Sequence, residues 1–141
     1  MKTRTSPTCR VLYVEDTRED QQILREAIDF ADVPVELITA NTAQSALKLL
    51  SNGDHFHILL LDWNLPAVTG LEFLTNLRAA QPTVPVIILT GEPRLVDTPT
   101  AKTLGARTIL KKPLILEEWE QLASQLYEHC DEQVSKATAT N

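Results

Sequence analysis

Five short runs of strand-forming residues alternate along the chain with segments of helical periodicity, and this alternation limits the fold more than any other feature. The runs cover residues 11–14, 35–40, 58–61, 86–89 and 108–110. Strands that alternate with helices pair in parallel, because each helix carries the chain back across the sheet. The first, third and fourth runs are apolar at consecutive positions, which is typical of central strands covered on both faces. The sequence therefore predicts an α/β fold, a doubly wound five-stranded parallel sheet with helices on both faces and the second and fifth strands at its edges.

Length and charge narrow the class of protein. The chain has 141 residues, and its 13 Lys and Arg against 19 Asp and Glu give a formal net charge of −6. The length fits one domain, and the acidic balance disfavours a nucleic-acid partner, whose phosphates need clustered cations. No apolar run approaches the roughly 18 residues of a membrane span, and no secretory signal precedes the first strand. We expect a cytoplasmic domain over 9–130, without membrane insertion, between disordered tails at 1–8 and 131–141.

The two cysteines, Cys9 and Cys130, lie near opposite ends of the chain. Neither has a second cysteine or a histidine at the spacing of a zinc site, and two cysteines do not make a disulfide framework. The sequence therefore favours reduced, structural thiols.

The fourth helical segment is interrupted by two prolines. Pro93 and Pro99 fall where a continuous helix would otherwise fit, and proline breaks a helix interior. We expect an irregular loop followed by a short helix that has Thr98 as its N-cap, Pro99 as its first residue, and Gly105 at its end.

Charged and polar side chains stand at the carboxyl ends of the predicted strands. Glu15 and Asp16 follow the first strand, Asp62 the third, Thr90 the fourth and Lys112 the fifth. In a doubly wound sheet these ends share one edge, where ligands bind. Carboxylates gathered there repel one another unless a divalent cation neutralises them, and oxygen ligands select magnesium, calcium or manganese over zinc. We predict Mg²⁺ as the cofactor and a phosphoryl group as the guest, because cation, ammonium and hydroxyl together meet its negative charge.

Several motifs together resemble the receiver domain of bacterial two-component response regulators, over about residues 10–128. They are the acidic pair Glu15-Asp16, the segment LLLDWNLPAVTG at 59–70, the strand end Leu89-Thr90-Gly91, Gly105-Ala106 and Lys112-Pro113. Each motif alone is weak, but in this order the set is specific. The resemblance implies a flavodoxin-like fold with strand order 2-1-3-4-5. It also implies a phosphoprotein of phosphorelay signal transduction that is a switch rather than a conventional enzyme.

The resemblance also implies an acceptor and a set of metal ligands. Asp62 would take a phosphoryl group as an aspartyl phosphate. Asp16 and Asp62 would bind magnesium through side-chain oxygens, Asn64 through its backbone carbonyl and Glu15 through a water.

Two further residues of the edge would complete the catalytic set. In the family, Thr90 moves toward the phosphoryl group and Lys112 pairs with it, while the peptide bond between Lys112 and Pro113 is cis. The adjacent Lys111 is the competing choice of lysine. Ile109 stands where receivers often carry an aromatic switch residue, so the usual coupling to Thr90 is in question.

Because the sequence carries no effector domain, the resemblance implies a stand-alone response regulator. It would take its phosphoryl group from a sensor histidine kinase or a histidine phosphotransfer protein and act through a partner, a homodimer or onward phosphorelay. The VED motif followed by Asp20 also resembles small receivers that serve phytochrome-type kinases. Two alternatives remain: a phosphorylation-independent docking module, and an aspartate-nucleophile phosphatase, which needs an acid where this chain has Asn64.

Overall fold

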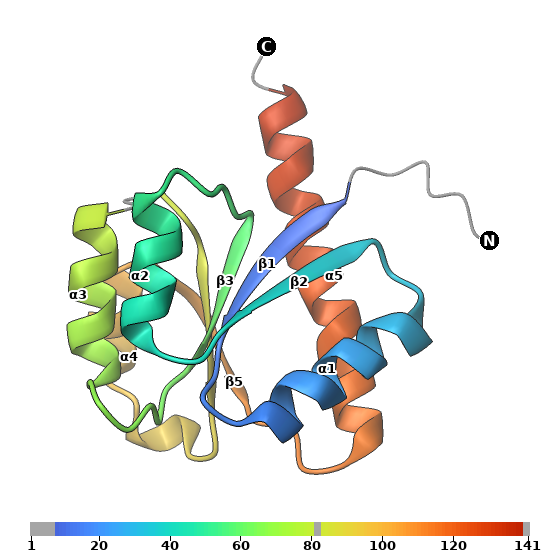
Figure 1. The fold of residues 1–141 in the computed structure, drawn as a ribbon, viewed down its shortest axis with the longest axis horizontal. Helices are drawn as coiled ribbons and strands as arrows, with labels where there is room; N and C mark the ends of the chain where they lie inside the picture. The colour runs from blue at the N-terminus through green and yellow to red at the C-terminus, as the bar shows by residue number, and fades with distance from the viewer. Residues whose placement is uncertain (1–7, 81–82, 140–141) are drawn as a thin grey trace.

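The computed structural model describes residues 8–80 and 83–139, the last nine as backbone, and shows a five-stranded sheet with helices on both faces (Figure 1). The strands are β1 (Cys9–Val14), β2 (Val35–Ala40), β3 (Ile58–Asp62), β4 (Val86–Thr90) and β5 (Ala106–Lys111). The helices are α1 (Arg18–Ala31), α2 (Ala43–Ser51), α3 (Gly70–Ala80), the 3-10 turn η1 (Pro93–Leu95), α4 (Thr98–Thr103) and α5 (Leu116–Ala139). The strands run in the order β2-β1-β3-β4-β5 with every neighbouring pair parallel, which confirms the predicted fold class.

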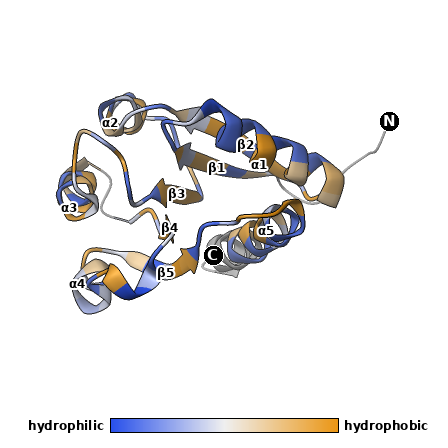
Figure 2. Ribbon diagram, turned by 90° about the horizontal axis from the view of Figure 1, so that it is seen from below, coloured by the Kyte–Doolittle hydropathy of each residue, from blue (hydrophilic) through white to orange (hydrophobic). Residues whose placement is uncertain are grey.

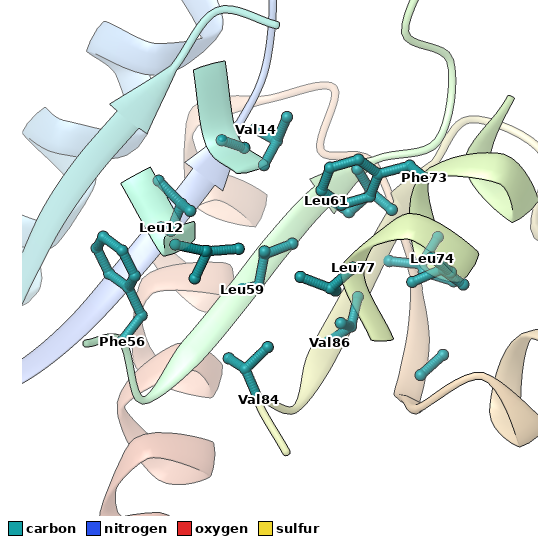
Figure 3. Close-up of a cluster of buried hydrophobic side chains, with 14 of the residues drawn as sticks. Leu12, Val14, Phe56, Leu59, Leu61, Phe73, Leu74, Leu77, Val84 and Val86 are labelled. Atoms are coloured by element: carbon teal, nitrogen blue, oxygen red, sulfur yellow. The ribbon is translucent and has the colours of Figure 1, made fainter. Parts of the chain in front are cut away.

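The sheet separates two apolar cores. Side chains alternate across a strand, so Leu59 and Leu61 of β3 enter the core beneath α2, α3 and α4, whereas Ile58 and Leu60 enter the core beneath α1 and α5. Figure 2 shows these two helix layers on opposite sides of the sheet, and Figure 3 shows the first core, where Phe73 and its helical neighbours pack on β3. All residues of β3 and β4 are buried; the apolar runs 58–61 and 86–89 predict this for all but the polar last residues, Asp62 and Thr90.

The fourth helix differs in its cap from the prediction. Its N-cap is Asp97, which accepts a hydrogen bond from the Thr100 N–H at 3.3 Å, and Thr98 is the first helical residue. Asp97, one position before the predicted cap Thr98, is the N-cap instead, because Asp caps a helix at least as well as Thr. The expected irregular loop contains the short turn η1, and the helix stops before Gly105, whose φ of +102° favours glycine.

The cysteine prediction was wrong, because Cys9 and Cys130 form a disulfide with their Cα atoms 5.7 Å apart. They are separated by 121 residues in sequence, so their spacing gave no sign of proximity. Packing of α5 against α1 and β1 brings them together at the end of the sheet where β1 begins.

The C-terminal segment also differs from the expectation. Helix α5 continues to Ala139, through most of the predicted tail at 131–141, and it projects beyond the sheet (Figure 1). The predicted N-terminal tail at 1–8 lies, apart from Thr8, outside the described residues. Within residues 8–80 and 83–139, none of the helices combines the length and apolar character needed to cross a membrane.

Candidate functional site

Three carboxylates meet at the carboxyl edge of the sheet, the lower edge in Figure 1. Glu15 and Asp16 leave β1, and Asp62 is the last residue of the neighbouring β3. One oxygen from each carboxylate lies within 4.8 Å of the others. Parallel pairing makes this convergence inevitable, because β1 and β3 end at the same side of the sheet. The structure therefore places together the acids that the sequence singled out.

Glu15 is fully buried, and both of its carboxylate oxygens accept hydrogen bonds. Its Oε1 accepts from the Tyr13 hydroxyl at 3.0 Å and from Lys112 Nζ at 2.7 Å, while Oε2 accepts from the Thr17 N–H at 3.2 Å. Burial, followed by the charge of Glu15, raises the pKa of Tyr13 and keeps its hydroxyl protonated as a donor. These donors stabilise a buried charge that would otherwise be costly.

Lys112 reaches the acids from the other side of the site. Besides Glu15, its Nζ lies 2.9 Å from Asp20 Oδ2 and 3.6 Å from Asp62 Oδ2. Burial alone would lower the pKa of Lys112, but hydrogen bonds to Asp20 and Glu15, together with the negative charges of Asp62 and Glu15, outweigh burial and raise the pKa above its ordinary value. Lys111, the competing lysine, is exposed, so the geometry favours Lys112.

The carboxyl ends of β3 and β4 and the loop after β3 supply the remaining predicted residues. Asp62 is buried, and its Oδ1 accepts a hydrogen bond from the Asn64 N–H at 3.1 Å, which holds the start of the loop after β3 against the carboxylate. Thr90 is also buried, and its hydroxyl oxygen accepts from the Glu92 N–H at 3.1 Å. The Thr90 carbonyl accepts from the Lys112 N–H at 2.8 Å, so both residues belong to the same edge.

The expected cis bond before Pro113 is absent, since the described residues contain no cis peptide bond. With the trans bond, Lys112 Nζ lies 2.7 Å from Glu15 Oε1. Ile109, at the position of the usual aromatic, is half-buried and packs against the core beneath α4.

Sequence reasoning missed two partners in this network, Tyr13 and the role of Asp20. A hydroxyl-bearing residue within the otherwise apolar run 11–14 of a central strand was the available signal for Tyr13, because a buried hydroxyl needs a hydrogen-bond partner. Asp20 appeared only as part of a motif, and its contact with Lys112 joins residues 92 positions apart. No local pattern predicts such a contact.

The donor set fits a hard divalent cation. All of the ligand atoms offered by the three clustered carboxylates are oxygens, which is the chemistry that magnesium prefers. Asp16 is exposed, whereas Glu15 and Asp62 are buried, so a cation could enter from solvent and keep part of its water shell. The ammonium of Lys112, 2.7 Å from Glu15 Oε1 and 3.6 Å from Asp62 Oδ2, offsets part of the negative charge of this group.

Fold and site together define an α/β domain with three clustered carboxylates at the carboxyl edge of its sheet that could hold a cation. A family model described as the response regulator receiver domain matches residues 11–124. The chain belongs to this family. Receiver domains are signalling proteins rather than classical enzymes; they generally take a phosphoryl group onto an aspartate and use Mg²⁺ at such a pocket.

Known relatives support this assignment. The chain is 33% identical over 109 residues to the response regulator MprA of Mycobacterium leprae, an alignment that covers 77% of this chain and 46% of that protein. The chain thus spans about half the length of the curated relatives it matches.

Solved structures show the same fold. A CheY-like receiver domain protein from Methanospirillum hungatei JF-1 has a TM-score of 0.76 and 25% identity, with 92% of this chain and 99% of that chain covered. The phosphorylated cyanobacterial phytochrome response regulator RcpA has a TM-score of 0.73 and 22% identity over 88% of this chain and 94% of that one.

Proposed function

We propose that Asp62 accepts a phosphoryl group from a phosphohistidine in a Mg²⁺-dependent reaction. The observation that carries this proposal is the meeting of Asp62 with Glu15, Asp16 and Lys112 at one edge of the sheet. Family membership makes phosphoryl transfer the reaction that best suits such an edge. An Asp62 oxygen would form the new bond to phosphorus, while the phosphorus–nitrogen bond breaks and the imidazole leaves with the bonding electron pair.

Four residues of the chain would hold Mg²⁺ beside the acceptor, either directly or through a water. When bound, Mg²⁺ supplies positive charge that screens the attacking carboxylate from the phosphoryl oxygens. Asp16 and Asp62 would hold it through side-chain oxygens and Asn64 through its backbone carbonyl. Glu15 would act through a water, which its two engaged oxygens favour over direct ligation.

Lys112 and Thr90 would respond to the new group. The Lys112 ammonium is 3.6 Å from Asp62 Oδ2 and could pair with a phosphoryl oxygen after a small movement. Thr90 stands at the end of the adjoining strand with its hydroxyl oxygen accepting one hydrogen bond, and its proton remains available as a donor. Movement of these two side chains would bias the surrounding surface between two conformations, which is the output of the switch.

Three consecutive apolar residues beside the site favour a protein partner. Leu114, Ile115 and Leu116 are 77%, 57% and 59% exposed and directly follow the Lys112-Pro113 pair. Exposed apolar clusters of this kind mark interaction surfaces. Since the chain is a receiver domain, this partner would be a phosphoryl donor, either a sensor histidine kinase or a histidine phosphotransfer protein, bound over this edge. The reaction would take place in the cytoplasm. The structural likeness to RcpA makes phytochrome-type kinases the first donors to test. For the output, the first partner to test is a second copy of this chain, which would form a homodimer.

Intact-mass measurement with acetyl phosphate and Mg²⁺ tests the acceptor. Wild type should gain one phosphoryl group, and Asp62→Asn should gain none. The matched control is Asp29→Asn, which removes an exposed aspartate of α1 that does not belong to the three clustered carboxylates. This variant should be phosphorylated like wild type. An equal adduct on Asp62→Asn would refute the assignment, and a wild type that binds partners without any adduct would establish the docking module instead.

A further inference from the structure

The Lys112 ammonium lies closer to Glu15 and Asp20 than to Asp62, the proposed phosphoryl acceptor. Its Nζ lies 2.7 Å from Glu15 and 2.9 Å from Asp20, both hydrogen-bond distances, but 3.6 Å from Asp62. An ammonium has three N–H donors, and two of them are therefore engaged by groups other than the acceptor.

We propose that Asp20 is a positioning residue that competes with the phosphoryl group on Asp62 for the Lys112 ammonium. The inference rests on the proposed function of Asp62 and adds a residue that acts through Lys112 without touching the transferred group. Asp20 does not belong to the cluster of Glu15, Asp16 and Asp62 whose oxygens could share a metal ion. Its carboxylate instead engages the ammonium directly.

Asp20 is the partner that Lys112 can release most cheaply. Its side chain is 24% exposed, so water can solvate the carboxylate once the ammonium leaves. Glu15 is fully buried and would lose a charge partner that water cannot replace. Asp20 also lies in the first turn of α1, where the helix dipole stabilises a carboxylate after the ion pair has broken.

A phosphoryl group on Asp62 would draw the ammonium across the short distance from Asp20. The ion pair with Asp20 therefore has to be broken each time the phosphorylated state forms. Partly exposed ion pairs contribute up to about 1 kcal/mol, and the upper part of this range corresponds to roughly three- to fivefold in an equilibrium constant. Removing the charge of Asp20 should make the phosphorylated state easier to reach by that factor.

Beryllofluoride, which imitates a phosphoryl group on a carboxylate, allows an equilibrium test. Its apparent Kd is measured at saturating Mg²⁺ from Trp63 fluorescence or fluorine NMR. Asp20→Asn should bind about three- to fivefold more tightly than wild type. Glu19→Gln removes the neighbouring charge of the same helical turn, where no ion pair with Lys112 forms, and should stay within about twofold of wild type.

A double-mutant cycle separates positioning from a general field effect. In a Lys112→Met background, or in Lys112→Gln if the first variant folds poorly, Asp20→Asn should no longer tighten binding. The same tightening in that background would show that Asp20 acts only by repelling the anion, and an unchanged Kd in Asp20→Asn alone would show no competition. Either result overturns the inference while leaving Asp62 as the acceptor. A wild type that neither binds beryllofluoride nor forms an adduct overturns both.

Discussion

Replacing Lys112 by methionine should destabilise the protein even without a phosphoryl donor, because Lys112 stabilises the buried Glu15. The pair distance of 2.7 Å corresponds to a gross Coulomb attraction of about 6 kcal/mol at an effective dielectric constant of about 20. Desolvation of the ammonium offsets part of this, and breaking a buried ion pair costs about 3–5 kcal/mol. Lys112 retains 22% exposure, so we expect a loss near the lower limit, about 3 kcal/mol in the free energy of unfolding.

Urea denaturation at pH 7 with a chelator present measures this loss. Lys111→Met is the matched control, because Lys111 is exposed and its substitution should change the free energy of unfolding by about 0.5 kcal/mol or less. The double variant Glu15→Gln/Lys112→Met should recover much of the loss, since a buried amide needs no counter-charge. Added Mg²⁺ should stabilise Lys112→Met more than wild type, because the cation then offsets carboxylate charge that the Lys112 ammonium no longer offsets.

Two results would contradict this reasoning. If Lys111→Met cost as much as Lys112→Met, the pairing with Glu15 would not be the source of the stability. If the double variant were no more stable than Lys112→Met, the loss would come from packing of the lysine side chain rather than from an unpaired carboxylate.

Other predictions concern regions around and beyond the site. Reducing the disulfide between Cys9 and Cys130 should lower the free energy of unfolding by up to about 5 kcal/mol, measured in urea with and without reductant. A free energy of unfolding that does not change with reductant, or free thiols in the unreduced protein, would exclude the bond. Burial and nearby positive charge lower the pKa of His57, so stability should be complete above about pH 6.5 and decline as the pH falls below it; a His57→Gln variant with the same acid dependence would disprove this. Gly70→Ala would overlap the Trp63 indole and should cost about 1–3 kcal/mol, with a changed emission spectrum as the check on the ring's displacement.

Much of the fold and the composition of the acidic edge follow from local patterns in the sequence. Uninterrupted apolar runs predicted β3 and β4, and helical periodicity between the runs predicted that the strands pair in parallel. Once strands are parallel, their carboxyl ends must share an edge, so Glu15, Asp62 and Lys112 could be grouped before any distance was known. Periodicity and strand polarity are local properties, and a linear sequence displays them directly.

Only the tertiary structure decided which groups touch. Lys112 Nζ lies less than 1 Å closer to Glu15 and Asp20 than to Asp62. This small difference in distance depends on how α1 and the loop after β5 are placed on the sheet. The pairing of Cys9 with Cys130 likewise depends on the packing of α5 against β1. Contacts between residues about a hundred positions apart arise from the packing of whole elements, and the short-range patterns of the sequence do not encode them.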